Sequence, residues 1–101
     1  MSEITIAFKS RFRDPLLNGT KIYTSRTKVM GQPGDTFQAF GATFELLSIK
    51  EMRLDEVARL WREEGCTSQE DFKELWAQIH PRTGYSDYQY VKLHHFKKIS
   101  L

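Results

Sequence analysis

The stretch at residues 17–28, LNGTKIYTSRTK, holds three side chains whose types could do chemistry. Lys21 is a base or a cation, Thr24 offers a hydroxyl, and Arg26 is a fixed cation. Residues 21–26 are β-branched and aromatic enough for a strand, on which Thr24 and Arg26 share a face while Lys21 and Thr24 oppose each other. A site that uses Lys21 with Thr24 needs Lys21 in the preceding turn, or a bulge between them. The spacing alone favours a solvated strand.

A carboxylate that could complete such a site stands immediately before Gly65. Glu63 and Glu64 come at a predicted helix end, where negative charge opposes the helix dipole. A residue placed against local preference can mark a site, although solvated glutamates at helix ends are common. The sequence leaves both glutamates open as the site carboxylate.

The remaining reactive side chains argue against a metal site. His94 and His95 are neighbours on a predicted strand and point to opposite faces, and His80 stands before a proline. With no cysteine pair and no chelating histidine spacing, we expect no metal and no cofactor. Cys66 is the only cysteine, so no internal disulfide forms, which favours a cytoplasmic location.

Charge is distributed unevenly along the 101 residues, whose net charge is +2. Residues 1–28 carry a net charge of +4, residues 51–75 carry −4, and residues 76–101 carry +3. If the basic ends share one sheet, they form a face suited to single-stranded RNA, although the charge pattern alone favours an ordinary mixed surface. Unpaired bases can stack on tyrosine rings, and the phosphates bind to cationic side chains. The candidate ligand or RNA contacts are Lys21, Arg26, Arg11, Tyr88 and Tyr90.

The elements that must position these residues follow from periodicity and turn signals. No apolar run is long enough to span a membrane, and the length indicates a single domain over residues 1–101. Strands are predicted at residues 4–8, 21–26, 36–40, 43–52 and 87–99. Three helices are predicted. A short helical turn is opened by Asp14-Pro15, and a second helix begins at Leu54 and is stopped by Gly65. A third helix begins at a capping box formed by Thr67 and Glu70 and ends at His80-Pro81. We expect Trp61, Phe72, Trp76 and Ile79 to pack against the sheet. A strand-rich chain of this size needs a closed or capped sheet, which favours a small barrel with helices beside it.

The run Gly19-x-Lys21-x-x-Thr24-x-Arg26, followed by Pro33-Gly34-Asp35 and later by Glu63-Glu64-Gly65, resembles the ASCH family. The resemblance extends over about residues 4–99 and implies a PUA-like α+β fold. That fold is a small β-barrel of five or six mostly antiparallel strands, with a two-helix insertion and a short N-terminal helix. The basic strand would line a ligand cleft.

Two functions are implied by the resemblance. Members of the family are proposed to bind RNA, which predicts an ASCH domain that holds RNA or a modified nucleoside in a basic cleft. One branch consists of amidohydrolases that deacetylate N4-acetylcytidine with a lysine, a threonine and a glutamate. These three residues correspond to Lys21, Thr24 and Glu64 in this sequence. An alignment shifted by one residue would place the glutamate on Glu63 instead. Ser25 departs from that branch, where an apolar residue is expected, and the helical insertion is closer to the wider family.

Overall fold

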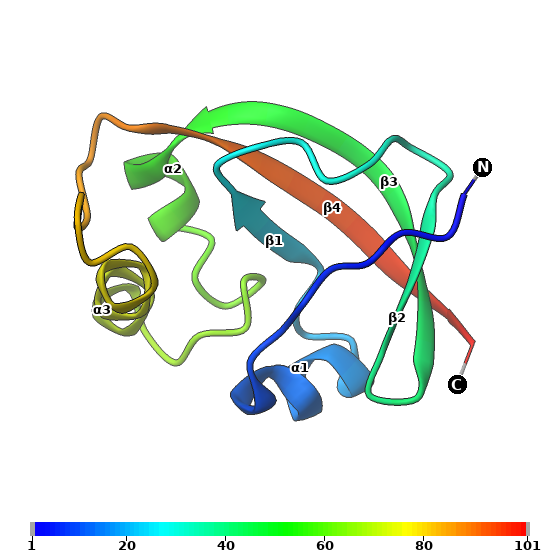
Figure 1. Ribbon diagram of the computed structural model, residues 1–101. Helices are drawn as coiled ribbons and strands as arrows, with labels where there is room; N and C mark the ends of the chain where they lie inside the picture. Colours follow the sequence, from blue (N-terminus) through cyan, green and yellow to red (C-terminus); the bar gives the residue numbers. More distant parts are fainter. Residues whose placement is uncertain (1, 101) are drawn as a thin grey trace.

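The computed structural model describes residues 2–100, which form a curled sheet with short helices beside it (Figure 1). The elements in chain order are η1 (Ser10–Phe12), α1 (Arg13–Asn18), β1 (Tyr23–Arg26), β2 (Thr36–Ala39), β3 (Ala42–Arg53), α2 (Leu54–Ala58), α3 (Gln69–Ile79) and β4 (Tyr90–Ser100).

The sheet has four antiparallel strands in the order β1-β4-β3-β2. The long strands β3 and β4 arch across the molecule, and the helices lie under this arch (Figure 1). Two register irregularities in the β3–β4 pairing, at Thr43/Phe44 and at Leu46/Ser48, accompany the curl. The structure confirms the predicted α+β class with a curled, barrel-like sheet, which here is a half-barrel of four strands rather than a barrel of five or six.

The missing strand is the one predicted at residues 4–8. Its alternation is real, because Ile6 is buried and Phe8 half-buried while Thr5 and Ala7 are exposed. However, only Glu3 is paired with β2, as an isolated parallel bridge to Thr36. The segment is therefore extended and packed by its side chains, without a hydrogen-bonded ladder. Burial of every second residue therefore does not require that a segment be paired with a neighbouring strand.

The helices differ from the sequence prediction mainly at their ends. The helix that starts at Leu54 is regular only to Ala58, and turns continue to Gly65. The N-cap of α3 is Ser68, whose hydroxyl accepts from Asp71 N, so the predicted capping box was wrong by one residue.

Packing of α3 follows the predicted stripe except at its last turn. Phe72 and Trp76 are buried in the core, and Trp61 is packed partly against it. Ile79 is 48% exposed, so the prediction that it packs on the sheet was wrong. It lies in the last turn of α3 and lines the cleft described below, so it faces an opening rather than the packed core.

Candidate functional site

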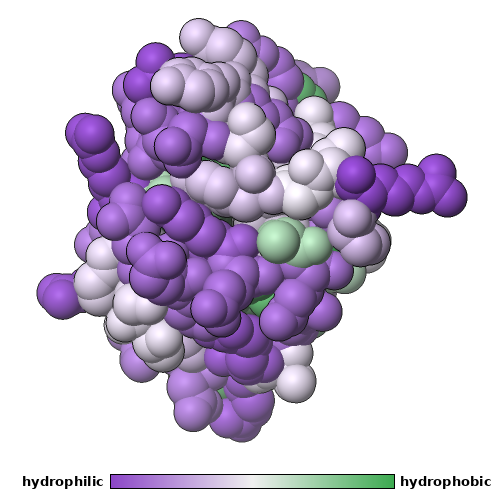
Figure 2. All heavy atoms as spheres, turned by 90° about the vertical axis from the view of Figure 1, so that its left-hand side faces the viewer, coloured by the Kyte–Doolittle hydropathy of each residue, from purple (hydrophilic) through white to green (hydrophobic). Residues whose placement is uncertain are grey.

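A cleft of about 730 Å³ lies between β1 and α3, within the size range of small-molecule sites. Its apolar wall consists of Ala7, Phe8, Phe12, Met30, Cys66, Phe72, Leu75, Trp76 and Ile79. Its polar lining consists of Lys9, Lys21, Thr24, Ser25, Arg26, Thr27, Lys28, Glu64, Gln78 and His80. Figure 2 shows that this side of the molecule is mostly hydrophilic, with apolar side chains visible in small areas between polar ones.

Lys21 lies at the bottom of this cleft and is only 3% exposed. It precedes β1, in the connection from α1, so it is free of the strand alternation that would turn it away from Thr24. Its Nζ donates to the carbonyl oxygens of Tyr23, at 2.7 Å, and of Glu64. Burial lowers the pKa of Lys21, and the Glu64 carboxylate opposes this shift.

The structure decides which glutamate enters the cleft. The turn that ends at Gly65 has the two hydrogen bonds of a Schellman motif, from Cys66 N to Trp61 O at 2.8 Å and from Gly65 N to Arg62 O at 2.9 Å. It leaves the Glu64 side chain 6% exposed, with Oε1 3.6 Å from Lys21 Nζ.

Glu63 has a different role. It is half-buried, and its carbonyl oxygen accepts hydrogen bonds from the backbone N–H groups of Ile22 and Tyr23, where β1 begins.

Gly65 allows the carboxylate and the lysine to approach each other. Its φ of +89° is a left-handed conformation, which glycine adopts without strain. A Cβ atom at this position would lie 2.9 Å from Lys21 Cδ and 3.0 Å from Phe12 Cδ1. The glycine is therefore required by its backbone conformation and by the space that Lys21 occupies.

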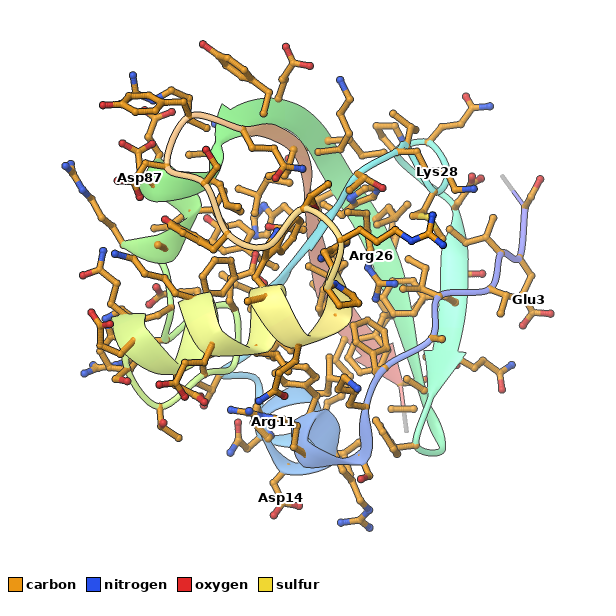
Figure 3. All side chains as sticks on the ribbon, turned by 60° about the vertical axis from the view of Figure 1, so that its left-hand side comes forward. Glu3, Arg11, Asp14, Arg26, Lys28 and Asp87 are labelled. Carbon is orange, nitrogen blue, oxygen red and sulfur yellow. The ribbon has the colours of Figure 1, made fainter. Side chains whose placement is uncertain are left out.

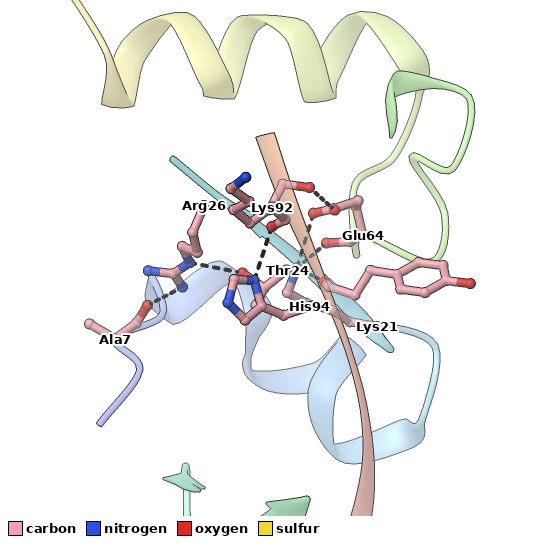
Figure 4. A network of polar contacts seen from close by, with 9 residues as sticks. Ala7, Lys21, Thr24, Arg26, Glu64, Lys92 and His94 are labelled. Carbon is pink, nitrogen blue, oxygen red and sulfur yellow. Dashed lines mark hydrogen bonds and ion pairs between the residues drawn. The ribbon is translucent and has the colours of Figure 1, made fainter. Parts of the chain in front are cut away.

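Thr24 and Arg26 share a face of β1, as the strand period predicts. Arg26 Nε donates to Thr24 Oγ1 at 3.1 Å, and Arg26 Nη2 donates to the carbonyl oxygen of Ala7 at 2.7 Å (Figure 4). The guanidinium also lies over the Phe8 ring, 5.4 Å from its centroid. Burial lowers the pKa of Arg26. Arg26 thus ties the extended N-terminal segment to the threonine.

Ser25 belongs to the site, although sequence reasoning noted it only as a departure from a family pattern. Its Oγ donates to Glu64 Oε2 at 2.6 Å. Strand alternation places Ser25 opposite Thr24, so no local signal could have joined it to the carboxylate 39 positions away.

His94 is a buried group behind the site. Its Nε2 accepts from Met30 N at 3.0 Å and its Nδ1 faces Lys92 O at 2.9 Å, which fits a neutral ring protonated on Nδ1. Burial lowers the pKa of His94, and the bond to Met30 holds the loop after β1 against the sheet.

Three predicted ligand contacts lie elsewhere. Arg11 forms an ion pair with Asp71 of α3 and does not line the cleft. Figure 3 shows Arg11 on one side of α3, and Arg26 and Lys28 on another. Tyr88 and Tyr90 are 76% and 60% exposed and also lie outside the cleft lining. The structure therefore does not bring these three residues together with Lys21 and Arg26.

No group of three metal-ligating side chains occurs within residues 2–100. The Cys66 thiol lines the cleft, but burial raises its pKa to about 11, so it is protonated at neutral pH. None of the helices in the described part of the chain is long and apolar enough to cross a membrane.

Comparisons with known proteins agree with this architecture. No protein-family model matches the chain, and no curated protein matches it. Among solved structures, the ASCH domain from Lactobacillus crispatus JV V101 is similar with a TM-score of 0.65 at 14% identity, over 99% of this chain and 79% of that one. Hypothetical protein PH0355 is similar with a TM-score of 0.69 at 16% identity, over 91% of this chain and 94% of that one. Protein EF3133 from Enterococcus faecalis V583 is similar with a TM-score of 0.67 at 13% identity, over 99% and 76%. At these identities the likeness establishes the fold, and the chain has the fold of an ASCH domain.

Proposed function

We propose that the cleft is the active site of an amidohydrolase that removes the acyl group from a modified nucleoside of the N4-acetylcytidine type. The buried pair of Lys21 and Glu64, with Nζ and Oε1 3.6 Å apart, carries this proposal. Taking two charges out of water costs several kcal/mol per ion, and such pairs inside a cleft mark candidate functional sites. A module that only bound phosphate would need exposed cations and no buried carboxylate.

The contacts of Lys21 favour one assignment of roles. Its Nζ faces two carbonyl oxygens and the Glu64 carboxylate, and only an ammonium has three protons to donate. Burial lowers the pKa of Lys21, but these acceptors favour its charged form. We assign Glu64 as the base and Lys21 as the positive charge that stabilises the oxyanion.

Thr24 is the attacking hydroxyl in this scheme. The hydrogen bond from Arg26 Nε to Thr24 Oγ1 favours the alkoxide character that attack requires. Thr24 Oγ1 adds to the acyl carbon and its proton passes to Glu64 through one water, because the carboxylate oxygens contact Ser25 and Lys21 rather than Thr24. Collapse expels the amine, which takes that proton and leaves an acyl-threonine ester. Water, deprotonated by Glu64, then hydrolyses the ester to the free acid.

The test is conversion of N4-acetylcytidine to cytidine and acetate, followed by chromatography. Thr24→Ala should lower turnover by at least about 100-fold. Lys21→Arg should keep part of it, because a cation remains. Thr20→Ala, at an exposed threonine of the same stretch, is the control and should match the parent. A parent protein with no turnover above the buffer rate would refute this function.

Binding of single-stranded RNA is the second candidate, favoured by the cations of the cleft. Lys9, Arg26 and Lys28 line it and form no ion pair within residues 2–100. Two or three phosphate contacts give a log–log salt slope of about −1.5 to −2. Anisotropy titrations of a labelled oligonucleotide should show this slope, and Lys9→Gln with Lys28→Gln should reduce it by about 1.4. Binding that is insensitive to salt would exclude this function.

A further inference from the structure

The hydroxyl of Ser25 contacts the carboxylate to which we assign the role of base. Ser25 Oγ lies 2.6 Å from Glu64 Oε2, while Glu64 Oε1 lies 3.6 Å from Lys21 Nζ. The two oxygens of one carboxylate therefore have different partners. Both Ser25 and Glu64 line the cleft.

The contact exists because β1 is an edge strand. Its free edge receives the turn before Gly65, where Ile22 N and Tyr23 N both donate to Glu63 O, at 2.8 and 3.1 Å. Glu64 consequently approaches β1 from that edge. The Ser25 side chain, which points away from the Thr24 face of β1, can therefore reach the Glu64 carboxylate at this edge.

We propose that Ser25 is a positioning residue for the hydrolysis, an inference that rests on the proposed function: by holding Glu64 Oε2 it keeps Oε1 beside Lys21 and available for the proton of the attacking hydroxyl. Glu64 is 4% exposed, so water does not readily replace the serine. Loss of the hydroxyl leaves a buried carboxylate oxygen without its donor and free to rotate.

Replacing the serine tests this role through kcat and KM. Ser25→Ala should lower kcat by roughly 10–100-fold, as removal of a supporting hydrogen bond does at other sites, with KM changed much less. Ser25→Thr keeps a hydroxyl and should recover most of the rate. Ser86→Ala, at an exposed serine outside the cleft, is the matched control and should leave both unchanged.

A second measurement does not depend on turnover. In protein labelled with ¹³C at the glutamate carboxyl carbons, the Glu64 signal is the one that Glu64→Gln lacks. At pH 7 the chemical shift of this signal should change in Ser25→Ala, because Oε2 loses its hydrogen-bond donor, whether or not the parent hydrolyses N4-acetylcytidine. Inactivity of the parent would thus refute the proposed function, while an unchanged chemical shift of the Glu64 signal would refute the role of Ser25. Ser25→Cys, which keeps the size and a weak donor, serves the same comparison if Ser25→Ala does not fold.

Two results would overturn the positioning role in an active parent. One is a Ser25→Ala variant with the parent's kcat. The other is an acyl group on Ser25 after a substrate pulse, found by peptide mass spectrometry, because Ser25 would then be the attacking hydroxyl. An acyl group on Thr24 would support the role.

Discussion

Replacing Glu64 with glutamine should destabilise the fold by about 3–5 kcal/mol, because it leaves the Lys21 ammonium buried without a counter-charge. The side chains of Glu64 and Lys21 are 6% and 2% exposed, so solvent compensates little of this loss. Glutamine keeps the size of the side chain, which confines the change to charge and hydrogen bonding. With an m-value near 1.5 kcal/mol/M, the urea midpoint should fall by about 2–3 M.

A surface ion pair provides the matched control. Lys92 Nζ lies 2.5 Å from Glu51 Oε1, and both side chains are partly open to solvent. Glu51→Gln makes the same chemical change and should cost less than about 1 kcal/mol. Equal costs for Glu64→Gln and Glu51→Gln, in urea titrations at pH 7, would refute the reasoning that burial makes the Lys21–Glu64 pair strongly coupled.

The pH dependence of the Glu64→Gln variant gives a second check. Burial lowers the pKa of Lys21, and the carboxylate that opposes this shift is gone in the variant. Between the folded pKa of Lys21 and its unfolded value of about 10.4, the unfolded chain binds more protons. The stability of the variant should therefore rise with pH towards 10.4, more steeply than that of the parent. A parallel dependence in the two proteins would contradict this.

Three further predictions concern the surroundings of the site. Gly65→Ala should lose more stability than Gly19→Ala, as measured by urea midpoints, because both glycines have a positive φ but only a Cβ at position 65 meets Lys21, at 2.9 Å; equal losses would contradict the steric argument. Burial lowers the pKa of His94, so the free energy of unfolding should decrease as pH falls below 6.5, the pKa of histidine in the unfolded chain. A His94→Gln variant whose free energy of unfolding depends on acid pH in the same way would contradict this. Trp76→Ala should cost about 3–5 kcal/mol, and an unchanged urea midpoint would show that α3 is not docked on the core.

Local signals in the sequence predicted most of the elements. Gly19 ends the short helix α1 as predicted, with the left-handed φ of +86° that a helix stop requires, whereas the helix begins at Arg13, before the predicted start at Asp14-Pro15. Gly41 marks the two-residue connection between β2 and β3, where it and Phe40 both have positive φ. Each signal involves residues a few positions apart, so it operates before any tertiary contact forms.

Element ends and strand pairing were less predictable. The alternation of residues 4–8 indicated burial correctly, but the pairing partners of an extended segment lie far along the chain. Ile79 continues the apolar period of α3 correctly, yet it lines the cleft and is 48% exposed. Periodicity reports which side of a segment is apolar and carries no information on what covers that side.

By itself, the sequence determined the residue types of the candidate site. The lysine, threonine and arginine of residues 21–26 and a glutamate before Gly65 were all recognisable, and the order GxKxxTxR pointed to an ASCH domain. Tertiary structure alone decided that Glu64 enters the cleft, that Ser25 holds its carboxylate, and that Lys21 is buried. These outcomes depend on the turn at Gly65 pairing with the free edge of β1, about 40 residues earlier in the chain. Contacts between such distant segments are set by how the whole core packs, which no local pattern of residues encodes.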